Sequence, residues 1–245
     1  ESMNALICQK LLGLDNSYTL PTVIWQNNQS EQTSEVLDNF GHENAKHIQL
    51  GGTEASIANH YEEETFTKYG KAYQSFKDDL FADKANAITL DFELDQDIQI
   101  NGRVHLELKV KSSTNRGLIS AQVLEMGDKK YLAPIPAPKR MSLDNGRLFK
   151  EEALRELPFK QAKYRVITKG HLNLQNRKDL LTIEDVTPNE WMTIGLDLQP
   201  TIYKLNKDDK LRLVLYTTDF EHTIRDNSDY ELTVDLSQSQ MTLPY

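Results

Sequence analysis

The sequence predicts a mainly β protein, a jelly-roll β-sandwich with a short N-terminal helix and a few helical turns. In several short segments apolar and polar residues alternate, which is the period-2 pattern of a half-buried strand. Long polar segments separate these strands, and the chain lacks the strand–helix rhythm that a parallel sheet requires. With 245 residues, the chain has the length of a large single all-β domain.

The first predicted element is a helix over residues 3–14. Gly13 and the polar residues after it provide a stop signal. Cys8, inside the apolar pattern, is expected to be a buried small hydrophobe. A lone helix with one apolar face must pack on another surface, and the chain starts inside this helix, so we expect a fragment of a longer protein. The apolar residues at helical spacing are Met3, Leu6, Ile7, Cys8, Leu11 and Leu14.

The segment from residue 19 to residue 86 is less regular. We expect strands over residues 20–26 and 47–50, with a short helical turn over residues 34–40 between them. Between residues 53 and 86, charged and aromatic residues follow no clean period. This part is therefore predicted to be an irregular, partly helical segment that lies across the sandwich.

From residue 87 onward the strand pattern is sustained. Asn101-Gly102 lies between two alternating segments, which is the strongest short signal for a hairpin. Turns are also expected at residues 115–117 and 126–129, and a helical turn at residues 150–157. The prolines of residues 133–139 exclude a central strand there. The predicted strands cover residues 88–94, 98–100, 104–110, 119–123, 164–166, 171–174, 192–198, 211–216 and 230–236.

The composition argues against nucleic-acid binding, an intrachain disulfide and a membrane span. The chain has 37 acidic and 28 basic residues and a net charge of -9, which argues against nucleic acid because phosphate binding needs clustered Lys and Arg. The densest basic segment, residues 160–165, is interpreted as a solvated strand face. One cysteine excludes an intrachain disulfide. Because no run of about 18 apolar residues exists, no membrane span is predicted.

The sequence also lacks a recognisable nucleophile. A serine hydrolase of the α/β type needs its serine in a Gly-x-Ser-x-Gly turn, and no serine here has glycine on both sides at that spacing. Cys8 lacks the electropositive setting that would activate a thiol. A glycine-rich phosphate loop is absent as well. We therefore predict no catalytic residue and no cofactor in this chain.

The candidate metal ligands have simpler interpretations. His42 and His47 are five residues apart, which is wrong for one helical face, so we interpret them and His60 as loop histidines. The oxygen-rich segment 226–229 could suit calcium, but it lacks the glycine and terminal glutamate of an EF-hand loop. Turn chemistry is the favoured interpretation there, and no metal is predicted.

Other residues that could bind a ligand are expected to be structural. Trp25 and Trp191 could form a sugar-stacking platform, as in lectin jelly rolls, although core packing is the favoured role of each. His105 and His171 lie in predicted strands among polar neighbours and are expected to face outward.

Several segments strongly resemble the X-prolyl dipeptidyl aminopeptidases of lactic acid bacteria. The clearest are Leu20-Pro-Thr-Val-Ile-Trp-Gln-Asn-Asn28 and Leu211-Arg-Leu-Val-Leu-Tyr-Thr-Thr-Asp219. The resemblance extends over essentially the whole chain, but only to the C-terminal portion of that family. The other matching segments are residues 2–15, 31–33, 37–41 and 47–51.

The resemblance implies a cytoplasmic, homodimeric serine peptidase that releases Xaa-Pro dipeptides from peptide N-termini. Its α/β-hydrolase domain, with the Ser-Asp-His triad, would lie upstream of residue 1, so no triad residue is carried over. Residues 1–18 would be the remnant of the last helix of that domain, and residues 19–245 a non-catalytic jelly roll of galactose-binding-domain-like fold. A tryptophan is common in the family where Ser34 stands here, so contacts at this position are expected to differ.

The leading hypothesis is therefore a non-catalytic accessory domain that packs on the upstream hydrolase domain and shapes its active-site entrance. The polar loop 219–229 separates two strong strands, and its residues Phe220, His222 and Arg225 are the predicted interdomain contact. Two alternatives stay open: a carbohydrate- or cell-wall-binding jelly roll, and a free-standing enzyme with an unrecognised site.

Overall fold

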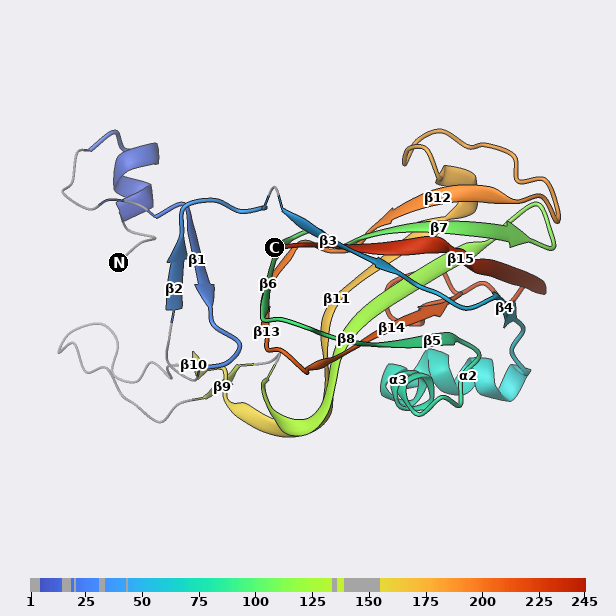
Figure 1. Ribbon diagram of the computed structural model, residues 1–245, viewed down its shortest axis with the longest axis horizontal. Coiled ribbons are helices and arrows are strands. Elements are labelled where there is room, and N and C mark those ends of the chain that lie inside the picture. Colours follow the sequence, from blue (N-terminus) through green and yellow to red (C-terminus); the bar gives the residue numbers. More distant parts are fainter. Residues whose placement is uncertain are drawn as a thin grey trace.

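The structure, a computed structural model, describes residues 5–14, 19, 21–30, 34–42, 44–133, 136–138 and 155–245. Its centre is a sandwich of two antiparallel sheets, which Figure 1 shows as two layers. The first sheet has the order β11 (Phe159–Asn173), β8 (Leu118–Leu132), β14 (Lys210–Tyr216) and β5 (Ile88–Glu93). The second has the order β12 (Met192–Asp197), β7 (His105–Ser112), β15 (Tyr230–Pro244) and β3 (Ala45–Gln49), and β4 (Glu54–Asn59) also pairs with β15.

The main core lies between these two sheets. Successive side chains of a strand point to opposite faces, so every second residue of β7 and of β14 enters the core. Leu106 and Leu108 of β7 are fully buried, as are Leu211, Leu213 and Leu215 of β14. All five belong to one cluster of packed apolar side chains. The prediction of a mainly β sandwich is therefore confirmed.

A second, smaller core lies on the outer face of the first sheet, under the helices α2 (Glu63–Lys71) and α3 (Tyr73–Phe81) (Figure 1). Phe76 and Leu80 of α3 pack there against Leu124 and Tyr216 of the sheet. The segment 53–86 is thus more regular than expected, because it contains strand β4 and both helices. The helices were hard to predict because α2 buries only Tyr69, and α3 buries only Phe76 and Leu80. No helix of the described residues is long and apolar enough to cross a membrane.

Among the described residues, three two-stranded sheets complete the architecture. They are β1 (Val23–Gln26) with β2 (Ser34–Leu37), β6 (Ile98–Gly102) with β13 (Thr201–Leu205), and β9 (Ala137–Pro138) with β10 (Arg155–Glu156). The helical turn expected over residues 34–40 is wrong, since Val36 pairs with Ile24 of β1 in antiparallel register. The helical turn expected over residues 150–157 lies mostly outside the described residues.

The hairpin predicted at Asn101-Gly102 is also wrong. Strand β6 pairs with β13, with Ile100 opposite Tyr203, whereas β7 pairs with β12 and β15 in the second sheet. The Asn101 side chain instead holds a neighbouring loop: its Oδ1 accepts from the Gly41 N–H at 3.1 Å, and its Nδ2 donates to the Asn39 carbonyl at 3.3 Å. Asn-Gly is a local turn signal, but here the Asn101 side chain binds the neighbouring loop instead of forming a hairpin turn.

Two further boundaries differ from expectation. The turn predicted at residues 126–129 is absent, because β8 continues to Leu132 and Met126 pairs with Tyr164 of β11. The segments 164–166 and 171–174 belong to one long strand, β11, which contains two irregularities of register.

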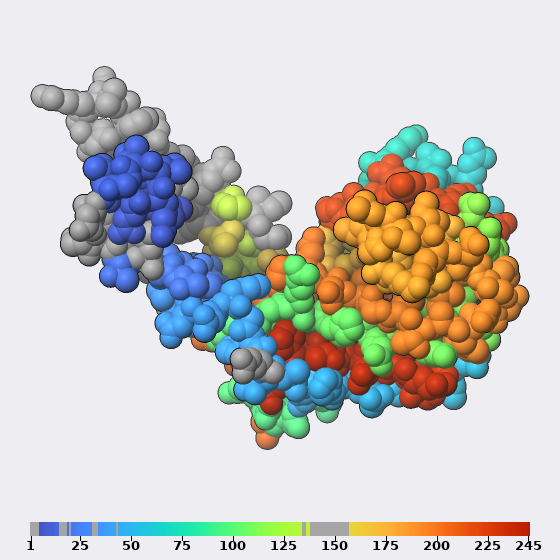
Figure 2. All heavy atoms as spheres, turned by 90° about the horizontal axis from the view of Figure 1, so that it is seen from above, coloured from blue at the N-terminus to red at the C-terminus, as the bar shows by residue number. Residues whose placement is uncertain are grey.

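The N-terminal residues lie apart from the sandwich (Figure 1), and Figure 2 shows this blue segment projecting from the body of the molecule. They include a π-helical segment, η1 (Ile7–Leu11). Cys8, expected to be buried, is only partly buried. Several large apolar side chains of this segment are exposed, namely Leu6, Ile7, Leu11, Leu12 and Leu14.

Candidate functional site

The loop 219–229, between β14 and β15, is anchored to the sandwich by Asp219. Its Oδ2 accepts a 2.6 Å hydrogen bond from the Tyr216 hydroxyl, and its Oδ1 accepts from the backbone N–H groups of Glu221 at 2.8 Å and His222 at 2.9 Å. The Asp219 side chain is fully buried. A buried carboxylate with this many donors fixes the start of the loop, because leaving any of them unpaired is costly.

Phe220 points inward from this loop. Its ring lies 5.0 Å from the ring of Phe76, 5.2 Å from that of Tyr69 and 5.3 Å from that of Tyr61, between centroids. Only 1% of the residue is exposed. In this conformation the Phe220 ring packs into the aromatic cluster and anchors the loop, and it offers no surface to another domain. The polarity of its sequence neighbours concealed this role, because the aromatic partners are about 150 residues away along the chain.

The Arg225 side chain connects the loop backbone with helix α2. Its Nε and Nη2 donate to the Phe220 carbonyl at 3.2 and 3.0 Å. Its Nη1 lies 3.2 Å from the position that a Cβ would occupy at Gly70 of α2. The side chain is therefore held between the loop backbone and α2, although the residue is exposed as a whole.

His222 belongs to a small group of polar side chains at the end of β11. Its Nε2 lies 2.7 Å from Glu221 Oε2 and contacts Nζ of Lys169. Its ring is 6.1 Å from the ring of His171. The structure thus brings His222 and His171 together, and places both apart from the aromatic interior that holds Phe220.

His171 is less exposed than expected for an outward-facing residue. Its Nδ1 lies 3.0 Å from Ser120 Oγ, and burial lowers the pKa of its imidazole. This Ser–His contact does not resemble a hydrolase site, since Ser120 is fully buried and its hydroxyl donates to the Thr217 carbonyl at 2.6 Å. Substrate could not reach that oxygen.

The segment 226–229 makes turns, as predicted. Asp226 accepts from the N–H and the hydroxyl of Ser228, both at 2.8 Å. Asn227 bonds both the N–H and the carbonyl of Tyr61. The Asp226 bonds are the local bonds that Asx side chains form in turns, whereas the Asn227 bonds tie the loop to a distant part of the chain. Across the described residues, no group of three or more His, Cys, Asp or Glu side chains is arranged to hold a metal ion.

His47, His105 and Trp191 each have a side-chain partner on a neighbouring strand. His47 contacts Thr242 across β3 and β15, and His105 contacts Asp197 across β7 and β12. Trp25 is 8% exposed, so it packs in the interior as favoured. Trp191 is only partly buried, and the Lys111 ammonium lies 4.3 Å from its ring centroid.

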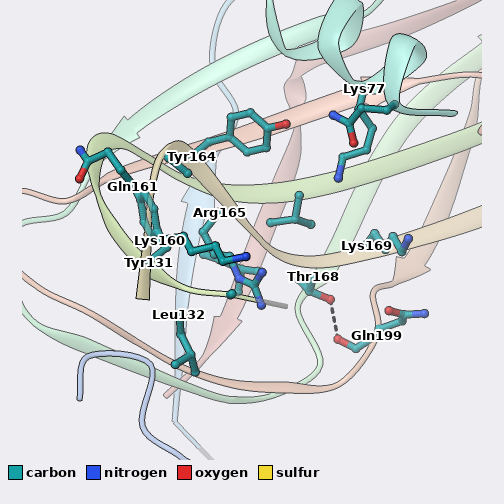
Figure 3. Close-up of a pocket in the computed structure, with 15 residues that line it drawn as sticks. Lys77, Tyr131, Leu132, Lys160, Gln161, Tyr164, Arg165, Thr168, Lys169 and Gln199 are labelled. Carbon is teal, nitrogen blue, oxygen red and sulfur yellow. Dashed lines mark hydrogen bonds between the residues drawn. The ribbon is translucent and has the colours of Figure 1, made fainter. Parts of the chain in front are cut away.

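Sequence reasoning missed a cavity of about 680 Å³ beside β11 (Figure 3). Five of the residues 160–165, expected to form a solvated strand face, line one side of it (all but Lys163), and Lys77 of α3 reaches it from another element. The available signal was a cluster of basic residues within an acidic chain. Its significance depends on α3, whose position the sequence did not reveal.

A polar loop anchored on two packed antiparallel sheets defines a β-sandwich domain. The chain belongs to the family of X-Pro dipeptidyl-peptidase C-terminal non-catalytic domains, whose family model matches residues 16–243. The resemblance seen in the sequence is thereby confirmed.

Similar proteins agree with this assignment. The chain is 94% identical over its whole length to an Xaa-Pro dipeptidyl-peptidase of Streptococcus thermophilus and 56% identical to one of Streptococcus pneumoniae. It spans 32% of the length of each of these relatives.

Solved structures share the fold at low sequence identity. A CocE/NonD family hydrolase from Staphylococcus aureus matches 99% of this chain with 45% of its own, at 12% identity and a TM-score of 0.60. An alpha-amino acid ester hydrolase matches 99% of this chain with 44% of its own, at 11% identity and a TM-score of 0.60. At such identities the likeness concerns the fold alone.

Proposed function

We propose that this chain is the accessory domain of a cytoplasmic, homodimeric serine peptidase that releases Xaa-Pro dipeptides, and that it packs on the catalytic α/β-hydrolase portion of the same polypeptide. In that position it shapes the rim of the active-site entrance. The family membership and the 32% coverage of the streptococcal peptidases support this proposal. The catalytic residues are then supplied by the other portion.

The observation that carries the proposal is the exposed apolar surface of the N-terminal segment. Leu11 is 77% exposed, Leu12 is 61% exposed and Leu14 is 55% exposed. Isolated exposed apolar residues are ordinary, but several within one short helical segment indicate a surface that another partner covers. Burying a leucine side chain stabilises an interface by roughly 1.5–3 kcal/mol. The hydrolase portion is the proposed partner.

The loop 219–229 is the proposed second contact. Because Phe220 is buried, the contact is assigned to the outer residues of the loop, with Phe220 and Asp219 as their support. Ile224 is 88% exposed, and His222 and Arg225 are exposed beside it. An apolar tip flanked by polar groups matches the arrangement of interfaces, which have an apolar centre and a polar rim.

The test combines this chain with the separately produced catalytic portion and measures hydrolysis of an Xaa-Pro anilide. We expect activity to rise on mixing, and the chain alone to be inactive. Leu11→Asp and Ile224→Asp should weaken the effect. Leu181→Asp is the matched control, since Leu181 is 93% exposed but lies outside both proposed contacts.

Full activity of the catalytic portion by itself would remove the proposed role in shaping the active site. Equal effects of all three substitutions would show that the proposed contacts are not specific. Turnover by the chain alone would contradict its non-catalytic role.

A further inference from the structure

The cavity beside β11 is lined by cations in a protein whose net charge is -9. Its fifteen lining residues include four basic side chains and no Asp or Glu. Figure 3 shows Lys77 reaching in from α3, Arg165 and Lys160 grouped on β11, and Lys169 at the far end. The volume, about 680 Å³, is in the range of small-ligand sites.

The cavity follows the free edge of a strand. Among the described strands, β11 pairs with β8 alone, so its other edge has no strand partner. At one end this edge is closed by Gln199, whose N–H donates to the Lys169 carbonyl at 2.8 Å and whose carbonyl accepts from Thr168 Oγ1 at 2.5 Å. Along the cavity, no described strand pairs with the edge between Phe159 and Ile167, and both register irregularities of β11 lie within or beside this edge.

The cations of this cavity are poorly neutralised. Lys169 pairs with Glu221 at 3.0 Å. In the part of the chain that the structure describes, no carboxylate lies within ion-pair distance of Lys77, Lys160 or Arg165. Burial lowers the pKa of Lys77; the charge of Glu221 raises it, and the charges of Lys169 and Arg165 lower it. Burial also lowers the pKa of Arg165. Half-buried charges of the same sign repel one another, and a bound anion would offset that repulsion.

The geometry points to a site for an extended peptide that carries a carboxylate, with its main chain along the edge of β11 and its carboxylate at Arg165, while Lys77 adds positive charge to the same cavity. A strand edge binds a peptide main chain by β-augmentation, and a guanidinium binds a carboxylate through two parallel hydrogen bonds. The side-chain amides of Gln74, Gln161 and Gln199 line the same cavity and suit peptide groups. That such a peptide is a substrate of the peptidase rests on the proposed function.

The test measures binding to this 245-residue chain by fluorescence anisotropy at low ionic strength. The probe is a labelled peptide Thr-Val-Thr-Val-Glu with a free C-terminus, compared with the uncharged Thr-Val-Thr-Val-Gln amide and with citrate as a competitor. We expect the acidic peptide to bind at least about tenfold more tightly than the amide, as charge-assisted hydrogen bonds are worth roughly 1.5–3 kcal/mol.

Arg165→Gln and Lys77→Gln should each weaken binding about tenfold, and Arg165→Lys should restore only part of it, since an ammonium cannot form the paired bonds. Lys71→Gln is the matched control, because Lys71 is an exposed lysine of α2 outside the cavity lining. Circular dichroism on each variant separates lost binding from lost folding.

Equal binding of the acidic and amidated peptides, or unchanged binding by Arg165→Gln, would overturn the site. Binding of citrate without the peptide would overturn the peptide assignment and leave a small-anion site. Since the assay needs no catalytic portion, failure here is distinguishable from failure of the proposed docking, which the mixing experiment reports.

Discussion

The Tyr216 hydroxyl donates a 2.6 Å hydrogen bond to Oδ2 of Asp219, and both side chains are almost completely buried. The same hydroxyl accepts from Nε2 of Gln122 at 2.7 Å. Burial raises the pKa of Tyr216 well above its usual value, so the phenol stays protonated and keeps donating. This chain of bonds joins the first sheet to the loop 219–229 and makes Asp219 the residue on which the loop conformation depends.

Asp219→Ala is expected to lower the free energy of unfolding by about 2–4 kcal/mol, because it leaves buried donors, including the Tyr216 hydroxyl, without an acceptor. Urea unfolding measures the change. Asp38→Ala, at an exposed position, should stay within about 0.5 kcal/mol of the unsubstituted protein. A loss below 1 kcal/mol for Asp219→Ala would contradict the anchoring role.

Phe220→Ala is expected to destabilise the domain by about 3–5 kcal/mol, since it removes a ring at the centre of the aromatic cluster and leaves a cavity. His222→Ala, at an exposed position of the same loop, should change stability by at most about 0.5 kcal/mol. Thermal melting of the two variants tests this difference. Similar, small effects would mean that the loop is only loosely packed on the helices.

The ion pair between Arg212 and Asp91 predicts a pH dependence. Nε and Nη2 of Arg212 donate to the two Asp91 oxygens at 2.6 and 2.8 Å, and this hydrogen bonding lowers the pKa of Asp91. The folded-state pKa then lies below the unfolded value of about 3.9. The contribution is therefore present above about pH 4 and is lost as the pH falls through the folded-state pKa.

Asp91→Asn should accordingly cost only about 0.5–1 kcal/mol at pH 7, because the Asp91 side chain is 53% exposed and solvent screens the pair. Urea midpoints between pH 7 and pH 3 should converge for the two proteins as the pH falls. A gap that stays constant over this range would mean that the charge of Asp91 contributes nothing.

Two glycines should respond oppositely to alanine. A Cβ at Gly170 of β11 would lie 2.8 Å from the Asp197 carbonyl oxygen and 3.1 Å from Leu198 Cα. Because backbone must move to make room, Gly170→Ala should cost about 1–3 kcal/mol. At Gly70 of α2 the nearest atom is the flexible end of Arg225 at 3.2 Å, so the gain of up to about 1 kcal/mol in helix propensity should hold or raise stability. Melting temperatures that fall equally would contradict this reading.

Sequence patterns alone were enough to predict the class of the fold and the inward face of its main strands. Leu106 and Leu108 of β7, and Leu211 and Leu213 of β14, could be assigned to the core because strand periodicity is a local property. The absence of a Gly-x-Ser-x-Gly motif could also be seen in the sequence, because the residues of that motif are contiguous in the chain. The resemblance of several sequence segments predicted the family, and the match to the family model confirms it.

Which segments meet in the folded chain could not be predicted from local patterns. Strand β6 pairs with β13, about 100 residues later, and Phe220 packs against Tyr61 and Phe76 rather than facing solvent. The cavity arises because α3 brings Lys77 to the edge of β11 near Arg165. Periodicity states which face of an element is apolar, but the partner of that face depends on contacts between residues far apart in the chain, and these form only when the whole core assembles.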